Sequence, residues 1–163
     1  MTERERDPSS PIVLLLHGPN LDLLGEREPE VYGRATLADH VAAARAAATA
    51  AGLELEDVQS ASEATLVAAV HGARGRCTAI VVNPGALTHY GWSLHDALAA
   101  FEGIVIELHL SNPNAREAWR HTSVVAPVAT ATIAGLGGHG YPLAMVAVRR
   151  LLGPPSDPGA CPS

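Results

Sequence analysis

A carboxylate and an imidazole two residues apart form the first candidate for catalysis. Glu107 and His109 end an apolar run that starts at residue 104 and reads as a buried strand. Residues two apart on a strand share a face, so the two side chains should lie side by side. A neighbouring carboxylate selects the imidazole tautomer and favours its protonated form, which makes a plausible general acid. A purely structural His–Glu pair is an equally good interpretation of the spacing alone.

Tyr32 is a candidate base in the long segment 18–34, which carries glycine, proline and charged residues. Long irregular segments in compact domains are commonly functional. A tyrosine is a poor base at neutral pH unless a nearby cation stabilises the phenolate, and Arg27 could be that cation. Taken alone, an amphipathic tyrosine packed beneath a loop is the commoner role.

Three further polar residues follow expected strands. Asn83 ends a buried run and offers both a donor and an acceptor, although a turn residue is the commoner role of such an asparagine. Arg116 and Arg120 are four apart, so we expect them to share a helix face. Two guanidinium groups there suggest binding of a carboxylate or hydroxylated anion. On spacing alone, a solvated helix surface is the favoured interpretation.

Several kinds of chemistry are disfavoured. The chain contains no lysine, so a lysine Schiff base is excluded. His89, His109 and a carboxylate lack the tight spacing typical of zinc ligands, and we expect neither a metal nor another cofactor. Gly135, Gly137 and Gly140 match a dinucleotide-binding pattern, but no acidic residue on a second strand follows. Tight packing between a strand and a helix is the preferred interpretation.

The overall composition suggests a cytoplasmic protein. The 163 residues carry a net charge of −6, which argues against general affinity for nucleic acid or anionic membranes. The apolar run 12–16 is too short for a signal-peptide core or a membrane span. Cys77 and Cys161 fit no metal or redox spacing, so a reducing compartment is expected.

Strand and helix patterns alternate along the chain, which predicts an α/β fold. Strands are expected at 12–16, 53–59, 78–82 and 104–109, with a fifth within 124–134. Helices are expected at 36–51, 65–73, 92–101 and 115–120, and a last helix should end near residue 152. We predict a flavodoxin-like three-layer sandwich, with a five-stranded parallel sheet of order 2-1-3-4-5 between helices. One catalytic domain, 11–152, should lie between an N-terminal tail, 1–10, and a disordered C-terminal tail, 153–163. Its site should lie beyond the carboxyl ends of the strands.

Several ordered motifs resemble one enzyme family, the type II 3-dehydroquinate dehydratases, over roughly residues 12–152. They are Gly18-Pro19-Asn20-Leu21, Leu24-Gly25-Glu26-Arg27-Glu28-Pro29, Val31-Tyr32-Gly33, Asn83-Pro84-Gly85-Ala86, Ile106-Glu107-Leu108-His109-Leu110-Ser111-Asn112, Ala115-Arg116-Glu117 and Gly135-Leu136-Gly137. The resemblance implies a flavodoxin-like fold and a homo-dodecamer built as a tetramer of trimers. It also implies conversion of 3-dehydroquinate to 3-dehydroshikimate and water, a step toward chorismate and aromatic amino acids.

The resemblance assigns a metal-free anti elimination through an enolate. By similarity, Tyr32 takes the proton from C2 while Arg27 holds it as a phenolate. Asn20 helps to orient the water that stabilises the enolate oxygen. His109, oriented by Glu107, protonates the departing hydroxyl. The substrate-binding groups implied by the family are Asn83, the backbone N–H groups of Leu110 and Ser111, His89, Arg120, and Asp96 from a neighbouring subunit.

The chain departs from the family pattern at a few positions. His17 stands where the family usually has asparagine, and Tyr90-Gly91-Trp92 replaces a small polar pair, adding bulk near the carboxylate pocket. His95 and Thr122 also differ from the usual residues. A catalytically impaired homologue that acts as a carboxylate-binding or assembly protein is therefore one alternative. A flavodoxin-like module that binds a nucleotide or flavin is the other.

Overall fold

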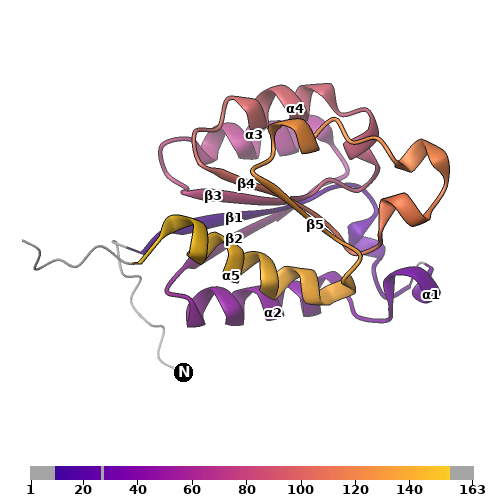
Figure 1. Ribbon diagram of the computed structural model, residues 1–163, viewed down its shortest axis with the longest axis horizontal. Coiled ribbons are helices and arrows are strands. Elements are labelled where there is room, and N and C mark those ends of the chain that lie inside the picture. Colours follow the sequence, from indigo (N-terminus) through magenta and orange to yellow (C-terminus); the bar gives the residue numbers. More distant parts are fainter. Residues whose placement is uncertain (1–9, 27, 155–163) are drawn as a thin grey trace, which may run out of the picture.

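The structure is a computed structural model, and it describes residues 10–26 and 28–154. A five-stranded sheet in the order β2-β1-β3-β4-β5 forms the middle layer (Figure 1). Every neighbouring pair of strands is parallel. This arrangement confirms the predicted flavodoxin-like architecture. The expected tails, 1–10 and 153–163, lie outside the described residues except at Ser10, Gly153 and Pro154.

The strands read as apolar runs because helices cover both faces of the sheet. The central strands are β1 (Ile12–His17), β3 (Ala79–Asn83) and β4 (Ile104–His109), and nearly all of their residues are buried. The edge strands, β2 (Glu54–Gln59) and β5 (Ala131–Ala134), are more exposed. Each predicted strand is therefore present, and the ends of the first four differ from the prediction by at most one residue.

Two pairs of helices cover the sheet, one pair on each face (Figure 1). On one face, α2 (Leu37–Ala50) and α5 (Gly140–Leu152) pack against alternate residues of β1, β3 and β4. On the other face, α3 (Glu63–Ala73) and α4 (Trp92–Ala99) pack against the remaining strand residues. The core is therefore divided into two apolar layers that sandwich the sheet.

Two of the helices begin at capping residues. The Thr36 hydroxyl accepts the Asp39 N–H, and the Asp39 carboxylate accepts the Thr36 N–H at 2.8 Å, completing a capping box at α2. The Thr36 N–H and then the Thr36 hydroxyl, which both donate to the Asp39 carboxylate, hold the pKa of Asp39 below its usual value. At α3, the Ser62 hydroxyl accepts the Thr65 N–H and caps the helix. The Glu63 carboxylate accepts the Leu94 N–H at 3.0 Å and ties α3 to α4.

The prediction of a helix at 115–120 is wrong. Two 3₁₀ turns occupy this region, η3 (Pro113–Ala115) and η4 (Ala118–Arg120), and the backbone of Arg116 between them is extended. A helix of six residues forms too few internal hydrogen bonds to offset its nucleation cost. The extended backbone lets the Arg116 side chain reach Tyr32, as described below. The segment 18–34 likewise contains two short turns, η1 (Leu21–Leu23) and α1 (Pro29–Tyr32).

Within the described part of the chain, none of the helices has the length and apolar character needed to cross a bilayer.

Candidate active site

A cavity of about 190 Å³ opens beyond the carboxyl ends of β1, β3 and β4. The connections from β1 and β3 leave toward opposite faces of the sheet here, which is where ligands bind in open α/β folds. Most of the expected site residues line this cavity. They are Asn20, Tyr32, Asn83, His89, His109, Leu110, Ser111 and Arg120.

Two tight turns press against one another to form the floor of the cavity. A Cβ atom on Gly18 would lie 2.2 Å from the Pro84 carbonyl oxygen, so only glycine fits this position. The Gly18 N–H donates to the Asn83 carbonyl at 2.8 Å. Asn20 has a φ of 67°, a left-handed conformation that is costly for a residue other than glycine. Asn20 thus lies in the cavity wall, two residues after the glycine that packs against Pro84.

Tyr32 contacts an arginine that the sequence did not assign to the site. Arg116 Nη1 donates to the Tyr32 hydroxyl at 2.6 Å, and the guanidinium carbon lies 5.5 Å from the phenol ring centroid. Only 15% of the Arg116 side chain is exposed, so a solvated surface is the wrong interpretation of this residue. The guanidinium is therefore a charged hydrogen-bond donor to the phenol oxygen. The spacing of Arg116 and Arg120 was a signal for this residue, but it indicated anion binding rather than a contact with Tyr32.

Arg27, the expected partner of Tyr32, lies outside the described residues. Its contact with Tyr32 stays a prediction. The carboxylate of Glu28 lies 3.9 Å from Arg116 Nη2, so the loop that carries Tyr32 also contacts Arg116 through Glu28.

The Glu107–His109 pair is present and is extended by two hydroxyl groups. His109 Nε2 lies 2.7 Å from Glu107 Oε1, which leaves Nδ1 as the ring nitrogen that can act on a ligand. The same carboxylate oxygen accepts the hydroxyl groups of Thr88 and of Ser123, the latter at 2.9 Å. Burial favours the neutral acid, but these hydrogen bonds outweigh it and hold the pKa of Glu107 below its usual value. The buried carboxylate therefore stays charged and orients His109.

Tyr32 and His109 approach the cavity from opposite faces of the sheet. Tyr32 packs against the apolar layer that contains α2 and α5. Glu107 and His109 share the opposite face of β4, where Thr88 contacts the carboxylate beside the layer of α3 and α4. A ligand in the cavity would therefore have a potential base and a potential acid on different sides.

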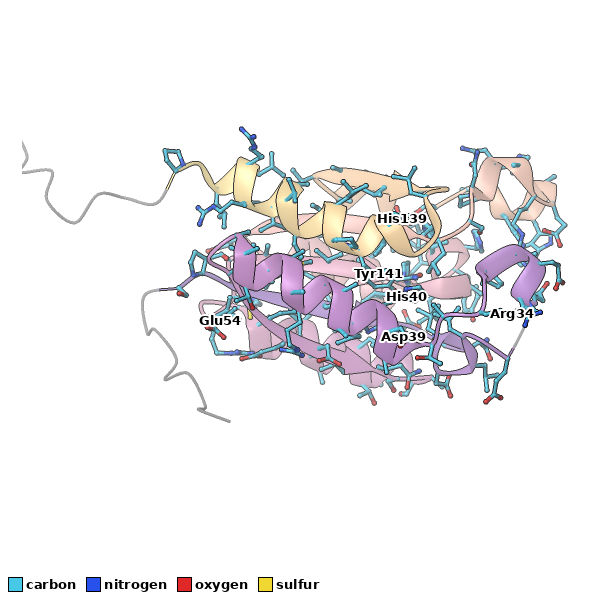
Figure 2. All side chains as sticks on the ribbon, turned by 90° about the horizontal axis from the view of Figure 1, so that it is seen from below. Arg34, Asp39, His40, Glu54, His139 and Tyr141 are labelled. Carbon is cyan, nitrogen blue, oxygen red and sulfur yellow. The ribbon has the colours of Figure 1, made fainter. Side chains whose placement is uncertain are left out.

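Asn83 is held by two hydrogen bonds at the base of the cavity. Its Nδ2 donates to the Tyr141 hydroxyl at 3.3 Å, and its Oδ1 accepts the Gly85 N–H at 3.3 Å. Tyr141 stacks on His40, with ring centroids 5.1 Å apart, between α5 and α2 (Figure 2). Burial raises the pKa of Tyr141 to about 12, although the Asn83 contact opposes this, so its hydroxyl stays protonated at neutral pH.

The remaining polar residues lie along one rim. His89 Nδ1 lies 2.7 Å from the Thr122 carbonyl oxygen and must donate to it, which leaves Nε2 of the neutral ring as an acceptor. Arg120 Nε donates to Glu117 at 2.8 Å. The carbonyl oxygens of Leu110 and Ser111 accept the N–H groups of Gly137 and Gly135, which fixes the turn after β4.

Two sets of residues lie outside the cavity of their own chain. Asp96 is exposed on α4. Tyr90 and Trp92 are 60% and 62% exposed, so the bulk expected near the carboxylate pocket faces outward instead. If these residues act on a site, it is a site in another subunit.

The glycine-rich segment after β5 packs tightly against the core. A Cβ atom on Gly138 would lie 2.4 Å from the His40 ring, and one on Gly140 would lie 2.7 Å from Leu108. These contacts agree with the packing interpretation of the motif.

The sequence and the fold were compared with those of known proteins. Residues 11–149 match the family model described as dehydroquinase class II. The 3-dehydroquinate dehydratase of Herpetosiphon aurantiacus is 54% identical over 129 residues, which cover 79% of this chain and 90% of that protein. The 3-dehydroquinate dehydratase 2 of Pseudomonas putida is 49% identical over 142 residues, which cover 87% of this chain and 95% of that protein.

Solved structures agree with the sequence comparison. The crystal structure of type II dehydroquinase from Propionibacterium acnes superimposes with a TM-score of 0.84 at 42% identity, covering 86% of this chain and 97% of that one. A type II dehydroquinase from Butyrivibrio crossotus gives the same TM-score at 37% identity, covering 86% of this chain and 98% of that one. The sequence motifs, the fold and the residues of the cavity agree with these comparisons. The chain belongs to the class II dehydroquinase family.

Proposed function

We propose that this chain is a 3-dehydroquinate dehydratase, a hydro-lyase that forms 3-dehydroshikimate and water in the route to chorismate. The proposal rests on two side chains of one cavity, Tyr32 and His109, each of which contacts a charged partner. The Tyr32 hydroxyl has a guanidinium 2.6 Å away, and the His109 ring has a carboxylate 2.7 Å away. Anti elimination needs a base and an acid on opposite sides of the substrate, and these pairs supply both.

The reaction begins with removal of the C2 proton by the Tyr32 phenolate, which becomes a phenol. The electron pair moves toward the neighbouring ketone and forms an enolate. Arg116 stabilises the phenolate before this step, and the resemblance assigns the same role to Arg27. Asn20 orients the water that stabilises the enolate oxygen. Support comes from the 2.6 Å contact between Arg116 and Tyr32, and from the place of Asn20 in the cavity wall.

The second step expels the hydroxyl group. His109 donates the proton of its free ring nitrogen, so that the leaving group departs as water and the ring becomes an enone. Glu107 keeps the imidazole oriented through Nε2, and the ring is neutral after it has given up the Nδ1 proton. Thr88 and Ser123 hold the carboxylate in place through their hydroxyl groups. The chain has no lysine, so an enolate route is the available alternative to an imine.

The substrate carboxylate binds to Asn83 and to the backbone N–H groups of Leu110 and Ser111. The ring hydroxyls contact His89 and Arg120. All five residues line the same cavity, and His89 has an acceptor nitrogen free for a hydroxyl proton. Recognition of a hydroxylated cyclic acid requires this mixture of donors and acceptors around a compact cavity.

The assembly and the location belong to the same proposal. We propose a homo-dodecamer, a tetramer of trimers, in which Asp96 of a neighbouring subunit completes the site. The exposed position of Asp96 on α4, outside the cavity of its own chain, supports this arrangement. We further propose that residues 11–152 form one catalytic domain and that the enzyme works in the cytoplasm.

An ultraviolet assay with 3-dehydroquinate tests the activity directly, since the enone product absorbs where the substrate does not. We expect turnover in the presence of a strong chelator. Tyr32→Phe should lose at least about 10²-fold in rate while it still binds substrate, because only the proton-accepting oxygen is removed. A wild-type chain that forms no enone would contradict the proposed function, and normal turnover by Tyr32→Phe would contradict the assigned base.

A further inference from the structure

We propose that Trp119 determines substrate specificity, as an apolar wall that contacts the substrate ring and holds Arg120 and His89 in place. This inference rests on the proposed function, because it concerns the ligand of the same cavity. Trp119 lies on η4 and lines the cavity, yet its side chain stays more than half exposed. An exposed indole beside a cavity presents a flat apolar surface that a bound ring would cover.

The first observation is the contact between Trp119 and Arg120. The guanidinium carbon of Arg120 lies 4.0 Å from the indole ring centroid, which is a close cation–π contact. The Nε atom of Arg120 donates to Glu117 Oε2 at 2.8 Å. The indole thus fixes the flat face of the guanidinium, and Glu117 fixes one edge. The terminal nitrogens then remain for the hydroxyl groups of a ligand, since no partner for them is found in the described part of the chain.

The second observation is the contact between Trp119 and His89. The two rings meet edge to face, with centroids 5.2 Å apart and an interplanar angle of 78°. Since the His89 Nδ1–H donates to the Thr122 carbonyl, one ring nitrogen is fixed and the other is an acceptor. One indole therefore touches both a cationic donor and a neutral acceptor at the cavity rim.

These contacts match the chemistry of a polyhydroxylated carbocycle. Such a ring has an apolar surface of C–H groups and a polar rim of hydroxyl groups. An indole plane flanked by one donor and one acceptor can bind both at once. A planar or deoxygenated acid would contact the indole but would leave Arg120 and His89 without partners. Trp119 therefore favours hydroxylated rings over such analogues.

Steady-state kinetics of matched variants test the role. Trp119→Ala should raise KM about tenfold or more, with kcat changed less than about threefold, because Tyr32 and His109 are held by Arg116 and Glu107 rather than by Trp119. Trp119→Phe should recover most of the affinity, since a smaller aromatic face remains. Leu151→Ala is the control, because Leu151 is a large apolar residue that is 52% exposed at the end of α5 and lies outside the cavity. An unchanged KM in Trp119→Ala, or an equal change in Leu151→Ala, would overturn the inference.

Fluorescence supplies a readout that does not depend on turnover. The chain contains two tryptophans, so a Tyr32→Phe, Trp92→Phe double variant reports on Trp119 alone. Titration with 3-dehydroquinate should change its emission in a saturable way. The absence of a change at concentrations that saturate the wild-type enzyme would contradict the contact. This titration tests the contact of Trp119 with the ligand even if the wild-type enzyme shows no turnover. The proposed activity is tested only by the ultraviolet assay.

Discussion

Single residues in this protein owe their chemistry to one or two close neighbours. Arg116 is the clearest case, because its guanidinium donates to the Tyr32 hydroxyl at 2.6 Å and is itself largely buried. A charged donor is effective at that position because little water is present to screen it. The base of the proposed reaction thus depends on a contact between residues 84 positions apart in the chain.

Arg116→Ala should lower kcat by about 10²- to 10³-fold, because the phenolate of Tyr32 loses a charged hydrogen-bond donor. The ultraviolet assay at saturating substrate measures kcat. Arg45→Ala is the control, since Arg45 pairs with Asp57 at the surface and should leave kcat unchanged. A kcat for Arg116→Ala that matches the wild type would contradict its role.

His17 makes folding stability depend on pH. Burial lowers the pKa of its imidazole from 6.5 to about 4, although Asp57 opposes the change. Below pH 6.5 the unfolded chain binds a proton at His17 that the folded chain does not bind until about pH 4. Stability should therefore fall as pH drops through this window. One pKa unit corresponds to about 1.4 kcal/mol, so the loss can reach about 3 kcal/mol.

His17→Asn should remove this part of the pH dependence. Urea unfolding at pH 7.5 and at pH 5 measures the difference in free energy of unfolding. The gap between the two pH values should shrink in His17→Asn and persist in His71→Asn, because His71 is exposed. Equal gaps in both variants would show that His17 is not the titrating group.

At the scale of elements, two glycine turns set the distance between the strand ends that carry the site. The turns after β1 and β3 touch at Gly18, where no side chain fits. Asn20 and Asn83 both depend on this contact, because one follows the first turn and the other begins the second. The parallel strands bring their carboxyl ends to one edge of the sheet. The turns then determine how closely the ligand-binding side chains approach one another.

Gly18→Ala should destabilise the fold by about 1–3 kcal/mol, because the new methyl group would overlap the Pro84 carbonyl. It should also lower substrate affinity by moving Asn20 and Asn83 apart. Gly72→Ala is the matched control. Gly72 lies inside α3 with no atom within 4 Å of the added group, so alanine should stabilise the helix by about 0.5–1 kcal/mol. Thermal unfolding measures the stability of both variants. Equal changes in stability would refute the role of the turn contact.

At the scale of the whole molecule, one expected binding residue lies outside the cavity of its own chain. Asp96 lies on α4, away from the cavity that contains Tyr32 and His109. The proposed dodecamer, with a site shared between subunits, would account for this separation. An enzyme built in this way works only as an assembly, so its activity should depend on subunit association.

Mixed assemblies provide the test of a shared site. Tyr32→Phe and Asp96→Asn chains should each be nearly inactive alone. When they are unfolded together and reassembled, some sites should contain an intact Tyr32 from one chain and an intact Asp96 from another. Activity should then exceed that of either variant, whereas a mixture of separately assembled proteins should stay inactive. No recovery in assemblies with the mass of a dodecamer would contradict the shared site.

The sequence by itself determined the fold class, the strand order and eight of the residues that line the cavity. Apolar runs, helix patterns and turn residues are local signals, and parallel strands necessarily bring their carboxyl ends to one edge. Local signals also placed Glu107 beside His109, since a strand has a period of two residues. The motif resemblance added the expected identity of the remaining side chains.

Only the tertiary structure decided which arginine contacts Tyr32 within the described residues, and that the segment 113–120 forms two 3₁₀ turns. It also decided that Thr88 and Ser123 hold Glu107, and that Trp119 rather than Trp92 lines the cavity. These facts depend on contacts between residues far apart in the chain. Their geometry follows from packing and hydrogen bonding across the whole molecule, which no local pattern of residues contains.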